Sequence, residues 1–261
     1  MDKAEEMTGF LYEVNRRFED FCKRFNSESE VKNTTWDCPL GDIQVMMSRG
    51  DVFEKASAIY CDLEIDTPPV LAEQMKTNRK KMKALVLEIG IHPVNPFVPK
   101  GYIELRAHVT DSIALAGGTD IFPYFPNERD RDRFASAMQD LCTRHGQDYA
   151  AMQKVRSDFF KSRYSKDSVG SHAGFYSFYL TGDQMPFFRE MPEAFFEAYG
   201  RLVMERKGEA FSQADIEFKK KIHGDWVKWI LLEDDGTRFG LEKGIPAEAL
   251  LGAILPPVAT F

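Results

Sequence analysis

The first 25 residues place apolar and charged side chains with the period of an α-helix. Apolar residues recur three or four positions apart from Met7 to Phe25, and charged residues such as Arg16 and Lys23 fill the positions between them. This spacing gathers the apolar side chains into one stripe along a helix. The pattern predicts an amphipathic helix that packs one face on a core.

Residues 41–66 follow a different period, which is typical of strands. Apolar side chains alternate with polar ones from Ile43 to Met47, and Arg49-Gly50-Asp51 supplies a turn before the apolar run resumes at Val52. These features predict an antiparallel hairpin. Pro68-Pro69 ends the second strand, because proline has no N–H to donate to a neighbouring strand.

The rest of the chain alternates between the two periods. We expect strands at 84–91, 102–110, 175–180, 226–232 and 237–241, and helices at 130–142, 147–160, 192–207 and 247–254. Asp235-Gly236 is predicted as a hairpin turn between the last two strands. Ser212 and Asp215 have the spacing of a capping box and predict a further helix start.

Helices at both ends with hairpins between them predict an α+β fold, an antiparallel sheet covered by helices. No internal repeat or linker is visible, so residues 1–261 are expected to form a single domain.

Composition removes several classes of function. The net charge is −7, which argues against a general nucleic-acid binder, since such a protein needs a basic face. No apolar run reaches the roughly 18 residues of a membrane helix. The N-terminus is charged and has no apolar signal core. We therefore expect a cytoplasmic protein without a membrane span.

Motifs for metal and nucleotide chemistry are missing from the sequence. Its four cysteines are scattered without Cys-x-x-Cys spacing, so we expect free thiols. A metal site built from distant histidines is the remaining alternative to no metal at all; the histidines are His92, His108, His145, His172 and His223. No phosphate-binding glycine loop or nucleophile elbow is present.

Three phrases occur in order along the chain and carry a family resemblance. They are Val52-Phe53-Glu54-Lys55-Ala56, residues 92–125 with His92-Pro93-Val94-Asn95-Pro96 and Gly117-Gly118-Thr119-Asp120, and Glu233-Asp234-Asp235-Gly236-Thr237-Arg238-Phe239-Gly240-Leu241. The chain resembles the oxygen-dependent coproporphyrinogen III oxidases of haem synthesis over roughly residues 40–258. The resemblance implies a large curved antiparallel sheet flanked by helices on both faces, and a homodimer. It also implies dioxygen as co-substrate, without metal or organic cofactor.

The resemblance assigns two residues to the substrate directly. Asp120, which we expect at a loop-to-strand junction, matches an aspartate that faces the pyrrole N–H groups. A carboxylate can accept several N–H bonds and stabilise positive charge that develops on an oxidised macrocycle. Arg106 matches an arginine that holds a substrate carboxylate, which a planar guanidinium can bind through two hydrogen bonds. A turn carboxylate and an exposed strand arginine are the structural alternatives.

Other matching positions are changed. Tyr102 stands where the family has a histidine proposed for proton handling, and tyrosine is a poor base at neutral pH because its ordinary pKa is about 10. Asp235 replaces an arginine and disfavours a ligand with four carboxylates. Arg238 keeps the positive charge of a family lysine and is expected to hold a carboxylate, with Asp234 orienting one of the cations. Asn95 and the pair Gly117-Gly118 are further expected substrate contacts.

The sequence therefore predicts an oxidase that decarboxylates propionate side chains of a porphyrinogen. Its many aromatic residues, 13% of the chain, would suit a flat apolar cavity for a tetrapyrrole, although most are expected in the core. The changes at Tyr102 and Asp235 motivate a rival hypothesis, a divergent paralogue with another electron-rich or carboxylate-bearing substrate. A non-catalytic tetrapyrrole-binding protein is the third hypothesis.

Overall fold

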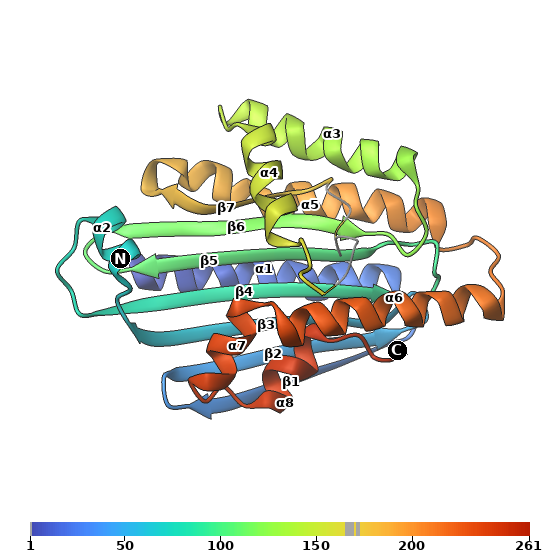
Figure 1. The fold of residues 1–261 in the computed structure, drawn as a ribbon, viewed down its shortest axis with the longest axis horizontal. Coiled ribbons are helices and arrows are strands. Elements are labelled where there is room, and N and C mark those ends of the chain that lie inside the picture. The colour runs from blue at the N-terminus through green and yellow to red at the C-terminus, as the bar shows by residue number, and fades with distance from the viewer. Residues whose placement is uncertain (1, 165–169, 171–172) are drawn as a thin grey trace.

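One antiparallel sheet organises the described part of the chain, which in this computed structural model comprises residues 2–164, 170 and 173–261. Each strand pairs with the next one in sequence (Figure 1): β1 (Ser29–Cys38), β2 (Gly41–Gly50), β3 (Phe53–Asp66), β4 (Lys81–Pro93), β5 (Lys100–Val109), β6 (Ile113–Phe122) and β7 (Phe175–Thr181). Such a meander brings residues from neighbouring strands into register at fixed positions, which matters for the site below.

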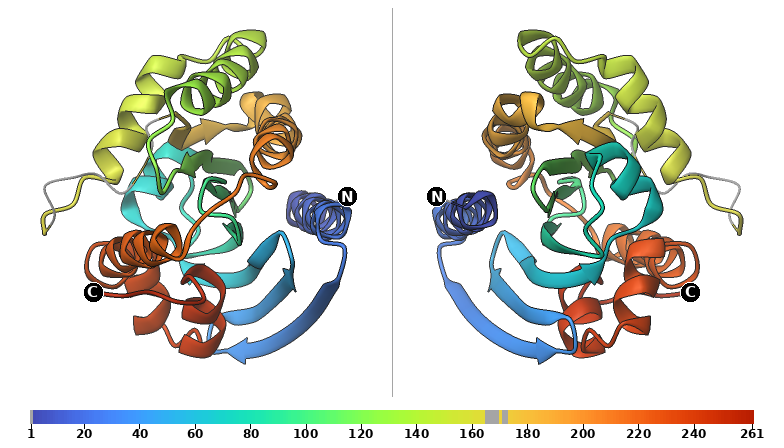
Figure 2. Two further views of the ribbon diagram at one scale, coloured as in Figure 1. Left: turned by 90° about the vertical axis from the view of Figure 1, so that its right-hand side faces the viewer. Right: turned by 90° about the vertical axis from the view of Figure 1, so that its left-hand side faces the viewer.

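Helices cover both faces of this sheet (Figure 2). On one side lie α1 (Lys3–Phe25) and α5 (Met185–Arg206), with α3 (Glu128–Arg144) packed on α5. On the other side lie α6 (Gln213–Leu232), α7 (Asp235–Glu242) and α8 (Ala247–Ile254), joined by the end of α4 (Tyr149–Phe159). A short helix, α2 (Pro69–Met75), connects β3 to β4. The predicted α+β fold with a curved, helix-flanked sheet is confirmed.

Alternation along the strands gives the sheet two apolar faces. On β4, Leu85 and Leu87 pack in the core that contains α1 and α5, whereas Ala84 and Val86 pack toward α6 and α8. Successive side chains of a strand point to opposite faces, so a strand buried on both sides is apolar almost throughout. The second face carries a cavity as well as a core.

The C-terminal elements differ from the prediction. Residues 226–232 are not a strand but the end of α6, and 237–241 are not its return strand but part of α7. Trp226, Trp229 and Ile230 have helical i, i+3, i+4 spacing and are buried, while the adjacent Leu231 is exposed. Asp234 caps α7 by accepting from the N–H of Thr237 at 2.8 Å, so the predicted hairpin turn is a helix start.

Three further differences are smaller. The strand β1 and the helix α2 were not expected; β1 is an edge strand rich in polar residues, and α2 begins at Pro69, directly after the predicted strand end. The predicted helix 192–207 begins earlier, at Met185, and carries Pro192 inside it. None of the helices in the described ranges is both long and apolar enough to cross a membrane.

Candidate functional site

A cavity of about 140 Å³ lies between the second face of the sheet and the C-terminal helices. It is lined on one side by strands β3, β4 and β5 and on the other by α6, α7 and α8. In Figure 1 these three helices lie on the near side of the sheet. Trp226, Trp229 and Phe159 give it aromatic walls. Its polar lining includes Glu88, Tyr102, Glu104, Arg106, His108 and Asp234.

Glu104 is the centre of the polar lining. Its Oε2 accepts hydrogen bonds from the hydroxyl of Tyr176, at 2.8 Å, and from that of Tyr102, at 3.3 Å. Its Oε1 pairs with Nε of Arg106. Burial, followed by the charge of Glu104, raises the pKa of Tyr102 well above its ordinary value. Tyr102 is therefore a hydrogen-bond donor here and not a base.

The predicted glycine pair makes this arrangement possible. Gly118 on β6 pairs with Glu104 on β5 and with Tyr176 on β7. A Cβ on Gly118 would lie 2.1 Å from a carbonyl oxygen of β7 and 2.8 Å from the Tyr176 ring. A Cβ on Gly117 would lie 2.6 Å from the carbonyl oxygen of Glu104. The backbone of both glycines thus passes close to protein groups of the site, and their contact with a substrate stays a prediction.

Arg106 is placed to bind an anion in the cavity. Its guanidinium lies beside the N-terminus of α7, because a Cβ on Gly236 would be 3.3 Å from Nη2. Within the described residues its two terminal nitrogens donate to no acceptor, since Glu104 engages Nε alone. The N-terminus of α7 is already capped by the carboxylate of Asp234. The terminal nitrogens of Arg106 can therefore hold one carboxylate of a ligand without the help of that helix end.

Asp120 lies in the interior of β6, opposite Tyr102, and not at a loop-to-strand junction as expected. Its side chain is fully enclosed and forms a buried ion pair with Arg156, with 2.9 Å between Oδ2 and Nη2. Oδ1 accepts from the backbone N–H of Ile121 and Gly174, both at 2.8 Å. Arg156 also stacks on the ring of Phe160, 3.4 Å from its centroid. Asp120 does not line the cavity in this structure, so its contact with a substrate stays a prediction.

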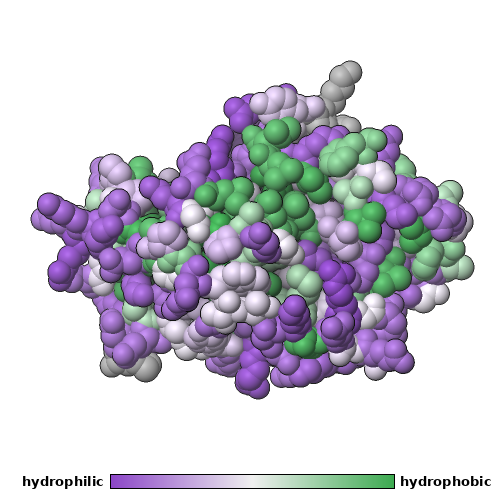
Figure 3. Space-filling view, turned by 90° about the horizontal axis from the view of Figure 1, so that it is seen from below, coloured by the Kyte–Doolittle hydropathy of each residue, from purple (hydrophilic) through white to green (hydrophobic). Residues whose placement is uncertain are grey.

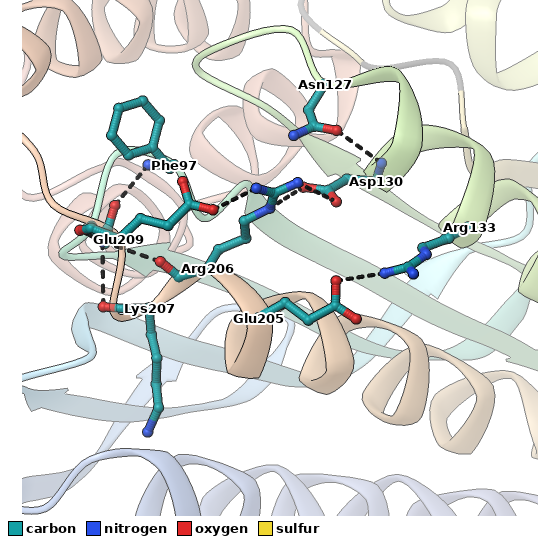
Figure 4. Close-up of polar contacts among 9 residues, drawn as sticks. Phe97, Asn127, Asp130, Arg133, Glu205, Arg206, Lys207 and Glu209 are labelled. Carbon is teal, nitrogen blue, oxygen red and sulfur yellow. Dashed lines mark hydrogen bonds and ion pairs between the residues drawn. The ribbon is translucent and has the colours of Figure 1, made fainter.

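Asn95 anchors a loop at some distance from the cavity. Its side-chain amide donates to three carbonyl oxygens at the end of α5, of which that of Glu209 is nearest at 2.8 Å. In the same region, Arg206 binds Asp130 through two hydrogen bonds of 2.9 and 3.0 Å and also pairs with Glu209 (Figure 4). This geometry gives Asn95 a role in loop position, and its predicted substrate contact is untested.

The residues predicted to form a hairpin at 234–238 lie in two different places, at the cavity and on the surface. Asp234 caps α7 and lines the cavity. Arg238 and Asp235 form an ion pair on the outer side of the helix, where their side chains are 53% and 84% exposed. Neither of the two lines the cavity.

This position leads to a prediction about Asp235. Replacing it with arginine, Asp235→Arg, should leave the affinity for a tetracarboxylate ligand within about twofold, because exposed charge pairs contribute little. Fluorescence titration of the variant and the wild type with coproporphyrin III measures both affinities. A gain of about tenfold or more would show that residue 235 does reach the ligand.

Four residues of the site were not singled out from the sequence. Glu88, Glu104 and Tyr176, at the cavity, look like ordinary strand residues, and Arg156, the partner of Asp120, looks like an ordinary helix residue. Charged residues in otherwise apolar strands, such as Glu88 on β4, are a signal that could have identified two of them.

The described ranges contain no cluster of side chains suited to a metal centre. There, no group of three or more His, Cys, Asp or Glu side chains could hold a metal ion. His92 and His223 are buried and meet edge to face, with ring centroids 5.3 Å apart, and His223 bonds to Tyr124 and to the carbonyl of Val258. His172 lies outside the described residues. The four cysteines are free, as expected.

Comparison with known proteins gives a consistent result. A family model described as "Coproporphyrinogen III oxidase" matches residues 6–261. The "Oxygen-dependent coproporphyrinogen-III oxidase" of Francisella tularensis subsp. mediasiatica (strain FSC147) is 27% identical over 95% of this chain and 85% of its own length. Proteins of the same description from Francisella philomiragia and from Francisella tularensis subsp. novicida (strain U112) are each 27% identical over 83% of this chain and 74% of their own lengths.

Proposed function

This chain belongs to the coproporphyrinogen III oxidase family, and we propose from this that it uses dioxygen to decarboxylate propionate side chains of a porphyrinogen, a step of haem synthesis. The match over residues 6–261 is the observation that carries the proposal. It includes every strand of the sheet and every residue of the cavity lining. The three oxidases named above are oxygen-dependent by description.

The cavity has the groups that this reaction requires. Trp226, Trp229 and Phe159 offer flat apolar surfaces for a pyrrole ring, and Arg106 offers to a propionate two terminal nitrogens that donate to no acceptor in the described part of the chain. Binding at these positions would hold one side chain of the substrate next to Glu88 and Glu104. The protein then contributes orientation, exclusion of water and fixed charges, while the electron-rich substrate supplies the electrons for dioxygen.

We further propose that the reaction needs neither metal nor organic cofactor, as the family resemblance implies. Metal-stripped protein incubated in air with coproporphyrinogen III should form the vinyl product, and the same mixture under argon should not. Turnover that is lost on stripping and restored by a metal ion would contradict this part of the proposal. A folded protein that is inactive in air would contradict the whole of it.

We also propose a cytoplasmic homodimer. The dimer is supported by exposed apolar side chains on the C-terminal helices, among them Leu231, Leu232 and Phe239. Figure 3 shows apolar side chains gathered on the face of the molecule seen from below. Contiguous apolar surface often marks a contact with another protein. Sedimentation equilibrium measures the state directly, and a monomer at micromolar concentration would contradict the proposal.

The dimensions and charge of the cavity favour a second candidate, a paralogue with a smaller substrate. Sites for drug-sized ligands typically measure about 300–1,000 Å³, whereas this cavity measures about 140 Å³. Its lining has the carboxyl groups of Glu88, Glu104 and Asp234 against the single guanidinium of Arg106. A whole tetrapyrrole requires α6, α7 and α8 to move away from the sheet. Binding of a monopyrrole propionate but not of coproporphyrin III, measured by quenching of the wall tryptophans, would favour the paralogue.

A further inference from the structure

Glu88 stands next to Glu104 on the sheet side of the cavity. The two residues face each other across the β4–β5 pair, and both line the cavity. Directly opposed residues of antiparallel strands have Cβ atoms about 4.5–5.5 Å apart. Two carboxylates at this separation repel each other, so ionisation of one makes ionisation of the other less favourable.

The surroundings decide which of the two carries the charge. Glu104 already accepts from Tyr102, Tyr176 and Arg106, which is the bonding pattern of a carboxylate. Within the described residues, the Glu88 side chain has no hydrogen bond or ion pair. Glu88 is therefore the group that keeps its proton.

Burial and the neighbouring carboxylates also favour the protonated form of Glu88. Burial, followed by the charges of Glu104 and Asp234, raises the pKa of Glu88 to about 8, against the opposing effect of the cations Arg106 and Lys100. Lys100 is itself buried against the ring of Trp226, and burial lowers its pKa well below the ordinary value, which weakens its effect as a cation. Among the described residues, further titratable groups around the cavity are Cys61 on β3, Tyr102 and His108 on β5 and Tyr176 on β7.

The reaction of the proposed function consumes a proton that the substrate does not carry. A propionate loses one hydrogen from the carbon next to the ring and loses its carboxylate as carbon dioxide, and a carbon–carbon double bond forms. The two electrons released reduce dioxygen to hydrogen peroxide, which takes up two protons. One of these comes from the broken C–H bond, and because the propionate enters ionised, the other must come from a donor in the cavity.

We propose that Glu88 is this proton donor, positioned by its pairing with Glu104 and recharged from solvent after each turnover. The inference rests on the proposed function, because it assigns the proton of that reaction. Within the cavity lining, Tyr102 and Arg106 hold their protons too tightly to release them near neutral pH.

Two variants test the proposal by steady-state kinetics. Glu88→Gln should lower kcat by about 100-fold or more, which is the usual effect of losing an acid catalyst. The wild-type rate should fall as the pH rises through about 8, where Glu88 loses its proton, and this alkaline limb should be absent from Glu88→Gln. The matched control is Glu64→Gln, an exposed glutamate on β3, which should keep both the rate and the limb.

A measurement without substrate separates this inference from the proposed function. The carbon-13 carboxyl signal of Glu88, assigned by its absence from Glu88→Gln, should titrate near pH 8. A midpoint near the ordinary value of about 4.3 would overturn the inference whatever the activity. An active wild type whose alkaline limb survives in Glu88→Gln would overturn the inference alone. An inactive, folded wild type would overturn the proposed function, and the proton step with it.

The protonation of Glu88 can also be tested through the pH dependence of folding stability. Between about pH 4.3 and 8 the folded wild type holds a proton on Glu88 that the unfolded chain releases. Wild-type stability should thus fall relative to that of Glu88→Gln as the pH rises through this window. A stability difference between the two proteins that stays constant from pH 5 to 8 would contradict a protonated Glu88.

Discussion

Breaking the buried pair of Asp120 and Arg156 should cost this protein about 3–5 kcal/mol of its free energy of unfolding. Both side chains are 1% exposed or less, and Nη2 of Arg156 lies 2.9 Å from Oδ2 of Asp120. Removing Asp120 leaves the guanidinium of Arg156 buried against the rings of Phe122 and Phe160, and removing Arg156 leaves the Asp120 carboxylate buried without that guanidinium. The variants Asp120→Asn and Arg156→Leu should each lower Tm by about 10 °C, given how stability scales with Tm in a chain of this size.

The double variant is the informative control. Asp120→Asn keeps an oxygen for the N–H groups of Ile121 and Gly174 and removes the charge that pairs with Arg156. Combining it with Arg156→Leu removes both charges, and the cost should be clearly smaller than the sum of the single costs. Chemical denaturation of the four proteins measures this coupling. Additive costs would show that the two side chains do not depend on each other.

The pH dependence of this effect can also be stated. Burial, opposed by the charge of Asp120, lowers the pKa of Arg156 to about 10. A base with a lowered folded-state pKa makes stability rise with pH only above that value, between about 10 and its higher ordinary value. The charge of Arg156 should therefore add no pH dependence to stability between pH 6 and 9.

Replacing Arg106 with methionine should raise KM for the porphyrinogen by about 30-fold or more. The reason is that a desolvated charge pair with a substrate carboxylate is typically worth about 2–5 kcal/mol. Arg106 is the guanidinium of the cavity lining, and its Nη2 lies close to Gly236 at the N-terminus of α7. Methionine keeps much of the apolar length of the side chain while removing the donors. The effect on kcat should be smaller, because Arg106 binds a part of the substrate that keeps its charge.

Arg238→Met is the matched control for this prediction. It removes the same kind of side chain from the same region of the fold, but its guanidinium is on the surface with Asp235. KM should stay within about twofold for this variant. Equal losses in the two variants would show that long-range charge, and not a contact in the cavity, governs binding.

Much of the fold could be predicted because single segments have a clear period. The stripe from Met7 to Phe25 forms α1, and the turn at Arg49-Gly50-Asp51 separates β2 from β3. The segment from Trp226 to Leu241 was mispredicted, because short aromatic runs fit a strand and a buried helix equally well. In the structure, Asp234 caps α7 through the N–H of Thr237 where the sequence analysis predicted a hairpin turn.

The site could be predicted only in part, because its contacts depend on strand register. Arg106 and Asp234 were identified and do meet at the cavity. The pairing of Glu88 with Glu104 follows from how β4 aligns with β5, and the ion pair of Asp120 joins residues 36 positions apart in sequence. Neither relation is encoded in a local pattern of residues.

The most direct test of oxygen-dependent decarboxylation is the stoichiometry of the reaction. Purified, metal-stripped protein is mixed with coproporphyrinogen III in a sealed cell, and dissolved oxygen, vinyl product and hydrogen peroxide are followed together. The account predicts one dioxygen consumed and one peroxide formed for each vinyl group. A folded protein that leaves both substrate and oxygen unchanged, or that forms vinyl groups without consuming oxygen, would contradict it.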